Sequence, residues 1–201
     1  MQVKGYLFAT LYFSLHGVNV LGELVKMVIP PSATSSDITK ANDDHYVYYD
    51  TDVLNYAEPS VFVMFPGTYG RPHNFQALLR RAAHTGYIAI GLTYINDKSI
   101  YSYCHESSQK DCYWDTRKTN IFGEQFPSSQ INVSPGNSIL NRLYSLLVYL
   151  IDKDATSGID YTYVLTPNYA TSNFVDSLRY DRLAFGGLSQ GAQSLRDIFM
   201  W

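Results

Sequence analysis

A five-residue apolar run that ends in Pro-Gly constrains the fold of this chain more than any other segment. The run is Val61-Phe62-Val63-Met64-Phe65, and Pro66-Gly67 follows it directly. A short continuous apolar run is typical of a strand that is buried on both faces of a parallel sheet. Parallel neighbours are joined by a crossover, usually a helix. The sequence after residue 67 should therefore contain one.

The next segment has the pattern of that crossover helix. Its apolar residues recur at helical spacing between Pro72 and Gly86, at Phe75, Leu78, Leu79, Ala82 and Ala83. A second apolar run, residues 87–92, predicts the returning strand. Such β-α-β units are right-handed in nearly all proteins. The predicted fold class is α/β, with a mostly parallel sheet and flanking helices.

Five further segments have weaker patterns. Residues 46–49 and 183–186 predict two more strands, and an apolar stripe predicts a helix over 139–151. We expect residues 161–165 to be extended. Periodicity is lost over 96–136, which predicts a long irregular excursion.

Length and composition favour one domain. The chain has 201 residues, of which 46% are hydrophobic, enough for one sizeable core. Residues 23–45 predict a flexible linker, because the stretch 30–44 has few apolar residues. The folded domain is then expected to span 46–201.

The first 22 residues resemble a secretory signal peptide. Lys4 precedes a short apolar run, and the small or medium residues Val20 and Gly22 follow it. This pattern predicts a secreted or lumenal protein. Two alternatives are a buried element at the start of the fold and a retained segment that tethers an interaction protein to a membrane. The run is too short for a stable membrane span.

Cys104 and Cys112 are the only cysteines, separated by seven residues. A loop disulfide closes easily at this spacing in an oxidising compartment. Two free thiols and a metal pair are the alternatives, but the spacing does not match the short zinc motifs, so we expect no metal. Asn132-Val133-Ser134 is a formal glycosylation acceptor, which agrees with secretion.

The charge pattern disfavours nucleic acid as a partner. The formal net charge is -3, and acidic and basic residues are mixed along the chain. A phosphate backbone needs a basic surface, which this sequence does not provide. Neither Gly-x-Gly-x-x-Gly nor a Walker loop is present, so no nucleotide or other cofactor is expected.

Gly187-Leu188-Ser189-Gln190-Gly191 matches the nucleophile elbow, Gly-x-Ser-x-Gly. In that elbow a strained turn between a strand and a helix lifts the serine hydroxyl above the sheet, and the flanking glycines leave room for it. The motif follows the predicted strand 183–186 and precedes a segment, 192–198, that can form the helix. Ser189 is therefore the candidate nucleophile.

A second loop has the features of an oxyanion hole. In the elbow architecture one donor is the amide after the nucleophile, here Gln190, and another comes from a loop after an earlier strand. Residues 66–70 follow the first predicted strand, and their two glycines permit the backbone to turn its amides toward a ligand. The second donor is expected to be Thr68 or Tyr69. An ordinary glycine turn is the alternative.

Several of these segments together are similar to the α/β-hydrolase superfamily of esterases and lipases. They are Phe65-Pro66-Gly67-Thr68, the predicted helix Leu78-Leu79-Arg80-Arg81-Ala82-Ala83, Gly86-Tyr87, Gly91-Leu92-Thr93-Tyr94 and Leu188-Ser189-Gln190-Gly191. The resemblance extends from Ser60 to the C-terminus. It implies that Ser189 attacks a small-molecule ester or related acyl substrate and forms an acyl-enzyme. It also implies an acidic residue and a histidine later in the chain.

The chain departs from the family after the elbow. The 12 residues that follow Ser189 contain Asp197 but no histidine. We expect Asp197 to be a surface charge or a helix-capping residue. His73 is the upstream histidine that could approach the site, although an exposed position in a first helical turn explains it more simply, and we do not assign it as the base.

These features predict a truncated N-terminal portion of a hydrolase domain, with later strands missing and with nearly no activity of its own. The alternative is a non-catalytic hydrolase-like module that binds a ligand or a protein through the same pocket.

Overall fold

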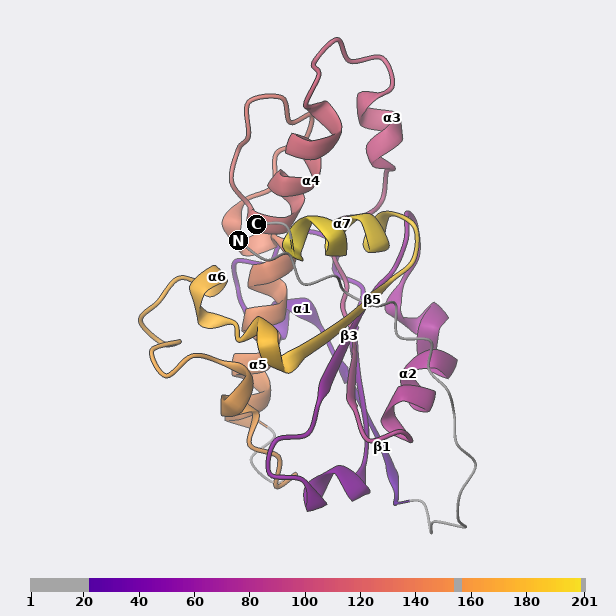
Figure 1. Ribbon diagram of the computed structural model, residues 1–201, viewed down its shortest axis with the longest axis vertical. Coiled ribbons are helices and arrows are strands. Elements are labelled where there is room, and N and C mark those ends of the chain that lie inside the picture. The colour runs from indigo at the N-terminus through magenta and orange to yellow at the C-terminus, as the bar shows by residue number, and fades with distance from the viewer. Residues whose placement is uncertain (1–21, 154–156, 200–201) are drawn as a thin grey trace, which may run out of the picture.

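The computed structural model describes residues 22–153 and 157–199 (Figure 1). The predicted signal peptide, residues 1–22, lies outside these ranges except for Gly22. Five strands form one sheet: β1 (Leu24–Ile29), β2 (His45–Asp50), β3 (Val61–Phe65), β4 (Ile88–Gly91) and β5 (Leu183–Gly187).

The strand order across the sheet is β1-β2-β4-β3-β5. β3 is parallel to both β4 and β5, and it places Phe65 opposite Gly187. β2 is antiparallel to both β1 and β4. The α/β class is confirmed, but the sheet is mixed: its centre is parallel, whereas β1 and β2 add an antiparallel edge.

Helices cover both faces of the sheet. The α-helices are α1 (Pro31–Thr34), α2 (Gln76–Ala83), α3 (Ile100–Cys104), α4 (Cys112–Phe122), α5 (Ile139–Lys153), α6 (Phe174–Ser177) and α7 (Gln190–Phe199). Short 3-10 turns are η1 (Thr51–Asn55), η2 (Pro72–Phe75), η3 (Pro135–Asn137), η4 (Tyr161–Val164) and η5 (Tyr180–Arg182). α2 lies on one side of the sheet and α5 on the other (Figure 1).

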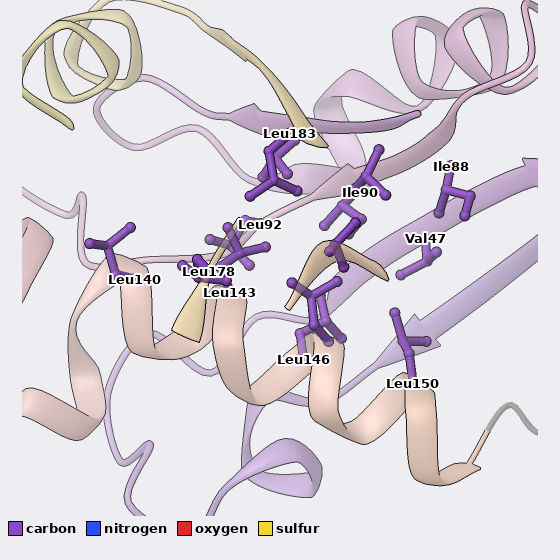
Figure 2. Packing of buried hydrophobic residues seen from close by; sticks show 14 of the residues in the cluster. Val47, Ile88, Ile90, Leu92, Leu140, Leu143, Leu146, Leu150, Leu178 and Leu183 are labelled. Carbon is purple, nitrogen blue, oxygen red and sulfur yellow. The ribbon is translucent and has the colours of Figure 1, made fainter. Parts of the chain in front are cut away.

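The larger core lies between the sheet and α5. Leu143, Leu146 and Leu150 of α5 point toward Val47 and Ile90 of the sheet (Figure 2). All five side chains are fully buried. This burial confirms that the predicted stripe of residues 139–151 is part of the core. Complete burial of one such side chain stabilises the fold by roughly 1.5–3 kcal/mol.

Alternation along β3 divides its side chains between two cores. Val63 and Phe65 face the α5 side, whereas Met64 packs with Leu79 and Ala83 of α2 on the other face. This burial on both faces explains why β3 is a continuous apolar run instead of an alternating one. The predicted β-α-β unit, β3-α2-β4, is confirmed with its parallel pairing.

The expected flexible linker, residues 23–45, is instead ordered. It contains β1, which pairs along the whole of β2, and α1. Polar contacts hold the rest: Arg142 donates to the carbonyls of Lys40 and Ala41, and Asn137 Oδ1 accepts from the Thr39 amide at 3.0 Å. Composition was misleading here because strand pairing, these hydrogen bonds and the burial of Ile29 and Ile38 together fix a segment with few apolar residues in its second half.

The excursion 96–136 is also more regular than its sequence predicts, because it contains α3 and α4. The buried face of α4 includes Asp115, Thr116 and Asn120, so it has no apolar stripe to detect. The predicted disulfide is confirmed: Cys104 at the end of α3 bonds to Cys112 at the start of α4, with 5.7 Å between their Cα atoms.

The segment 161–165, expected to be extended, is mostly the 3-10 turn η4. The Asp160 carboxylate caps this turn by accepting from the Thr162 amide at 2.9 Å. A side-chain acceptor at this position offers the backbone a local alternative to strand pairing.

Candidate active site

Ser189 occupies the turn between β5 and α7. Its φ angle is +52°, a left-handed conformation that residues other than glycine rarely adopt. Its side chain is exposed. The Leu188 amide donates to the Phe65 carbonyl at 3.2 Å, and the Gly191 amide donates to the Leu188 carbonyl at 2.9 Å. The strained serine is thus held against the end of β3.

The two elbow glycines are required by close backbone contacts. A Cβ atom on Gly191 would lie 2.3 Å from the Phe65 carbonyl oxygen. A Cβ atom on Gly187 would lie 2.6 Å from the backbone of both Gly191 and Ala192. Both distances are far below van der Waals contact. The turn can therefore form only with glycine on each side of the serine.

The loop after β3 packs directly against the elbow. A Cβ atom on Gly67 would lie 3.2 Å from Ser189 Cβ and 3.0 Å from the Leu188 carbonyl oxygen. The Thr68 hydroxyl donates to Gln190 Oε1 at 2.8 Å. Residues predicted separately as the nucleophile and the oxyanion loop therefore lie side by side.

Residues 67–70 form a tight turn, named here the 67–70 turn. The Gly70 amide donates to the Gly67 carbonyl at 2.9 Å, and Tyr69 has a φ angle of +60°. The Tyr69 amide donates to the Asn96 carbonyl at 2.8 Å, so it is already occupied. The amides of Thr68 and Gln190 donate to no backbone carbonyl within residues 22–153 and 157–199. Of the two candidates for the second donor, only Thr68 has a free amide there.

The elbow lies at a topological switch point, where the helices that follow two neighbouring parallel strands lie on opposite faces of the sheet. β3 and β5 are parallel neighbours, yet α2 after β3 packs on one face and α7 after β5 contributes to the core on the other. Open α/β sheets bind ligands at such a switch point, outside the carboxyl ends of the strands. Ser189 and the 67–70 turn both lie at these ends.

The loop after β4 holds the loop after β3. The Tyr94 hydroxyl donates to the Pro66 carbonyl at 2.5 Å, and burial raises the pKa of Tyr94 well above its usual value. Asn96 donates to the carbonyls of Gly67 and Gly70. The sequence patterns assigned neither Tyr94 nor Asn96 a role at the site. Their position after β4 was the available signal, because the carboxyl ends of neighbouring parallel strands meet at one edge.

No histidine is bonded to Ser189 in the described parts of the chain. His45 is buried and accepts from the Thr93 amide at 3.0 Å, His84 bonds to Asp50 Oδ2 at 3.0 Å, and His105 bonds to a carbonyl of its own helix. His73 is exposed in η2. The described residues therefore contain a candidate nucleophile and two candidate amide donors, but no histidine that is bonded to Ser189.

Asp197 is not the surface charge or helix cap that we expected. Its side chain is fully buried in α7, where it accepts from Arg117 of α4, itself nearly buried, and from Arg196 at 3.3 Å. The helix turns this residue toward α4, so the carboxylate faces away from solvent. It ties the disulfide-containing excursion to the helix that follows Ser189.

A cavity among the described residues lies away from Ser189. It measures about 220 Å³ and is lined by residues at the amino ends of β3 and β5, among them Ser60 and Leu183, and by the paired Glu58 and Arg182. Because Ser189 lies beyond the carboxyl ends of the same strands, this cavity cannot hold its substrate.

Three predictions concern features beyond the elbow. No cluster of three metal-ligating side chains occurs in the described residues. Within that same part of the chain, every helix is too short or too polar to cross a membrane. Asn132 lies in an exposed loop, where a glycan would be sterically accessible.

Comparison of the chain with protein-family models and with curated proteins finds no match. Its function is therefore inferred from the geometry of the site.

Proposed function

We propose that this chain carries the nucleophile and the oxyanion hole of a serine hydrolase of the α/β-hydrolase superfamily, acting on carboxylic esters. One observation carries the proposal: Ser189 is strained at φ +52° and exposed, and the turn containing Thr68 packs against it. Strained backbone conformations cluster at functional sites, where the surrounding structure maintains them. The steric need for Gly187 and Gly191 supports the same reading.

The proposed reaction is acyl transfer through Ser189. The hydroxyl oxygen attacks the ester carbonyl carbon while a base takes its proton, and the carbonyl oxygen becomes an oxyanion. The amides of Gln190 and Thr68 donate to that oxyanion. The carbon–alkoxide bond then breaks, the alcohol leaves with the proton, and water later releases the acid from the acyl-serine.

The base is the part of the site that the described residues do not supply. A serine hydroxyl is a weak nucleophile at neutral pH without one. An oxyanion hole alone still leaves residual catalysis of roughly 10³–10⁴-fold over water in a serine protease that lacks its triad. We therefore expect slow acylation of Ser189 that an added imidazole base accelerates.

Acetylation by p-nitrophenyl acetate tests the proposal. The chain is incubated with the ester, with and without imidazole, and its peptides are analysed by mass spectrometry. We expect an acetyl group on Ser189 that imidazole makes more abundant and that the S189A variant lacks. S194A is the matched control, because Ser194 is a nearby serine that is buried in α7. Acetylation of Ser189 no faster than that of exposed serines elsewhere would contradict the proposal.

A second candidate is a non-catalytic hydrolase-like module that binds a ligand or a protein at the same place, since no histidine is bonded to Ser189 within residues 22–153 and 157–199. This function predicts that no acyl group accumulates on Ser189 under either condition. For either function we propose a secreted or lumenal location, supported by the Cys104–Cys112 disulfide.

A further inference from the structure

We propose that Asn96 is the positioning residue of the oxyanion hole, because it holds the 67–70 turn in the geometry that leaves the Thr68 amide free to donate. This inference rests on the proposed function. Asn96 follows β4 and is 3% exposed. It has no contact with Ser189 among the described hydrogen bonds, so it would act only through the turn.

Asn96 bonds to three of the four residues of the 67–70 turn. Its side-chain Nδ2 donates to the Gly67 carbonyl at 2.6 Å and to the Gly70 carbonyl at 2.9 Å. Its own backbone carbonyl accepts from the Tyr69 amide at 2.8 Å. A single buried residue therefore satisfies two carbonyls of the turn, those of Gly67 and Gly70, and one amide, that of Tyr69.

The orientation of the Asn96 amide is determined by its partners. Arg71 Nη1 donates to Asn96 Oδ1 at 2.9 Å, and Arg71 Nε is paired with Asp43 at 2.6 Å. A flipped amide would place its oxygen against two carbonyl oxygens and its nitrogen against a guanidinium. Both contacts would be repulsive, so the network fixes one orientation.

The bond to Gly67 sets the direction of the Thr68 amide. The Gly67 carbonyl and the Thr68 N–H belong to the same peptide unit, which is planar and trans, so the two groups point in opposite directions. Because Asn96 holds the carbonyl at 2.6 Å, the N–H must point away from Asn96. Rotation of this peptide would cost that hydrogen bond.

The 67–70 turn needs the hydrogen bonds to Asn96 because its backbone conformation is unfavourable for one of its own residues. Tyr69 adopts φ +60° although it is not glycine, a left-handed conformation that is unfavourable for a residue with a Cβ atom. Its side chain is 69% exposed, so little packing compensates for this strain. The hydrogen bonds to Asn96 are the contacts that offset it.

The test compares N96A with a matched control, N120A. Asn120 is equally buried and donates to the Ile95 carbonyl in the same loop, but it has no hydrogen bond to the turn. We expect N96A to slow the acetylation of Ser189 by about 10²-fold, as loss of an oxyanion donor does. We expect N120A to remain within about threefold of the unmodified chain, even if it unfolds at a lower temperature. Equal slowing in both variants would overturn the proposal.

A second readout separates this inference from the proposed function. Hydrogen exchange of the Gly70 amide, measured by NMR, reports the closed turn without any chemistry at Ser189. We expect exchange at least about tenfold faster in N96A and unchanged in N120A. If Ser189 is never acylated, the proposed function is wrong. If exchange of the Gly70 amide still changes as expected, the inference that Asn96 stabilises the 67–70 turn is nevertheless supported. Unchanged exchange in N96A would overturn the inference itself.

Discussion

The Thr68 hydroxyl donates to Gln190 Oε1 at 2.8 Å, and this bond joins the turn after β3 to the first residue of α7. Gln190 is the residue directly after Ser189, and its side chain is buried. The two residues proposed as oxyanion donors are thus linked through their side chains. Their relative position depends on this contact.

Removal of that contact should destabilise the fold measurably. Thr68→Val deletes the hydroxyl at nearly constant volume and leaves the buried Gln190 oxygen unsatisfied, so we expect a loss of about 1–2 kcal/mol in the free energy of unfolding. Thr68→Ser keeps the donor and serves as the control. Urea unfolding measures both. Equal stability of the valine variant and the unmodified chain would contradict the importance of the bond.

Strain at Ser189 predicts an unusual order of stabilities. Glycine adopts φ +52° without penalty, so we expect S189G to be more stable than S189A by about 1 kcal/mol. Ser194, in the interior of α7, should show the reverse order, with S194G about 1 kcal/mol less stable than S194A. Urea unfolding of the four variants provides the comparison. If the alanine variant is more stable than the glycine variant at position 189 as well as at 194, Ser189 is unstrained.

The buried Arg117–Asp197 pair predicts strong coupling between α4 and α7. Asp197→Ala leaves a nearly buried guanidinium without its main carboxylate, which should cost about 3–5 kcal/mol. The double variant R117M/D197L removes both charges, and we expect it to be less destabilised than D197A alone. A double-mutant cycle of R117M, D197L and R117M/D197L, followed by urea unfolding, measures the interaction energy between the two side chains. Additive effects would indicate that the two side chains do not interact.

His45 predicts acid sensitivity between pH 6.5 and pH 5. Burial, and secondarily the charge of Arg142, lowers its pKa from 6.5 to about 3. Below pH 6.5 the unfolded chain therefore binds a proton that the folded chain excludes, so stability decreases as the pH falls. The expected loss is about 2 kcal/mol over this interval.

The control for this titration is a pair of variants. His45→Asn keeps an acceptor for the Thr93 amide but does not titrate, so its stability should change less over the same interval. His105→Asn alters a histidine outside the core and should retain the full loss. If His45→Asn shows the same pH dependence as the unmodified chain, His45 is not its source.

Local patterns predicted those parts of the molecule whose causes are local. The run at residues 61–65 became β3 with its limits unchanged, because both of its faces are buried. Gly187 of the elbow also carries a local steric requirement, because a Cβ atom there would meet the backbone of Gly191 and Ala192. The requirement for Gly191 comes from the distant Phe65 carbonyl, and only its place in the motif marks it in the sequence.

The missed features depend on contacts between distant segments. Asn96 acts on carbonyls of residues 67 and 70, which are distant in the sequence, so only its position after β4 indicates a place near the site. Asp197 was misplaced because its environment is supplied by Arg117 on another helix. β1 was mistaken for part of a linker although five of its six residues are apolar, because the prediction for residues 23–45 rested on the polar stretch 30–44 that follows it.

Covalent labelling by a fluorophosphonate tests the central claim, that Ser189 is the nucleophile of an acyl-transfer site, most directly. The serine oxygen would displace fluoride from phosphorus, and peptide mass spectrometry would identify the modified residue. We predict phosphonylation of Ser189, absent in S189A and retained in S194A, with imidazole increasing its rate. Intact chain that remains unlabelled at Ser189, or that is labelled equally at other exposed serines, would contradict the claim.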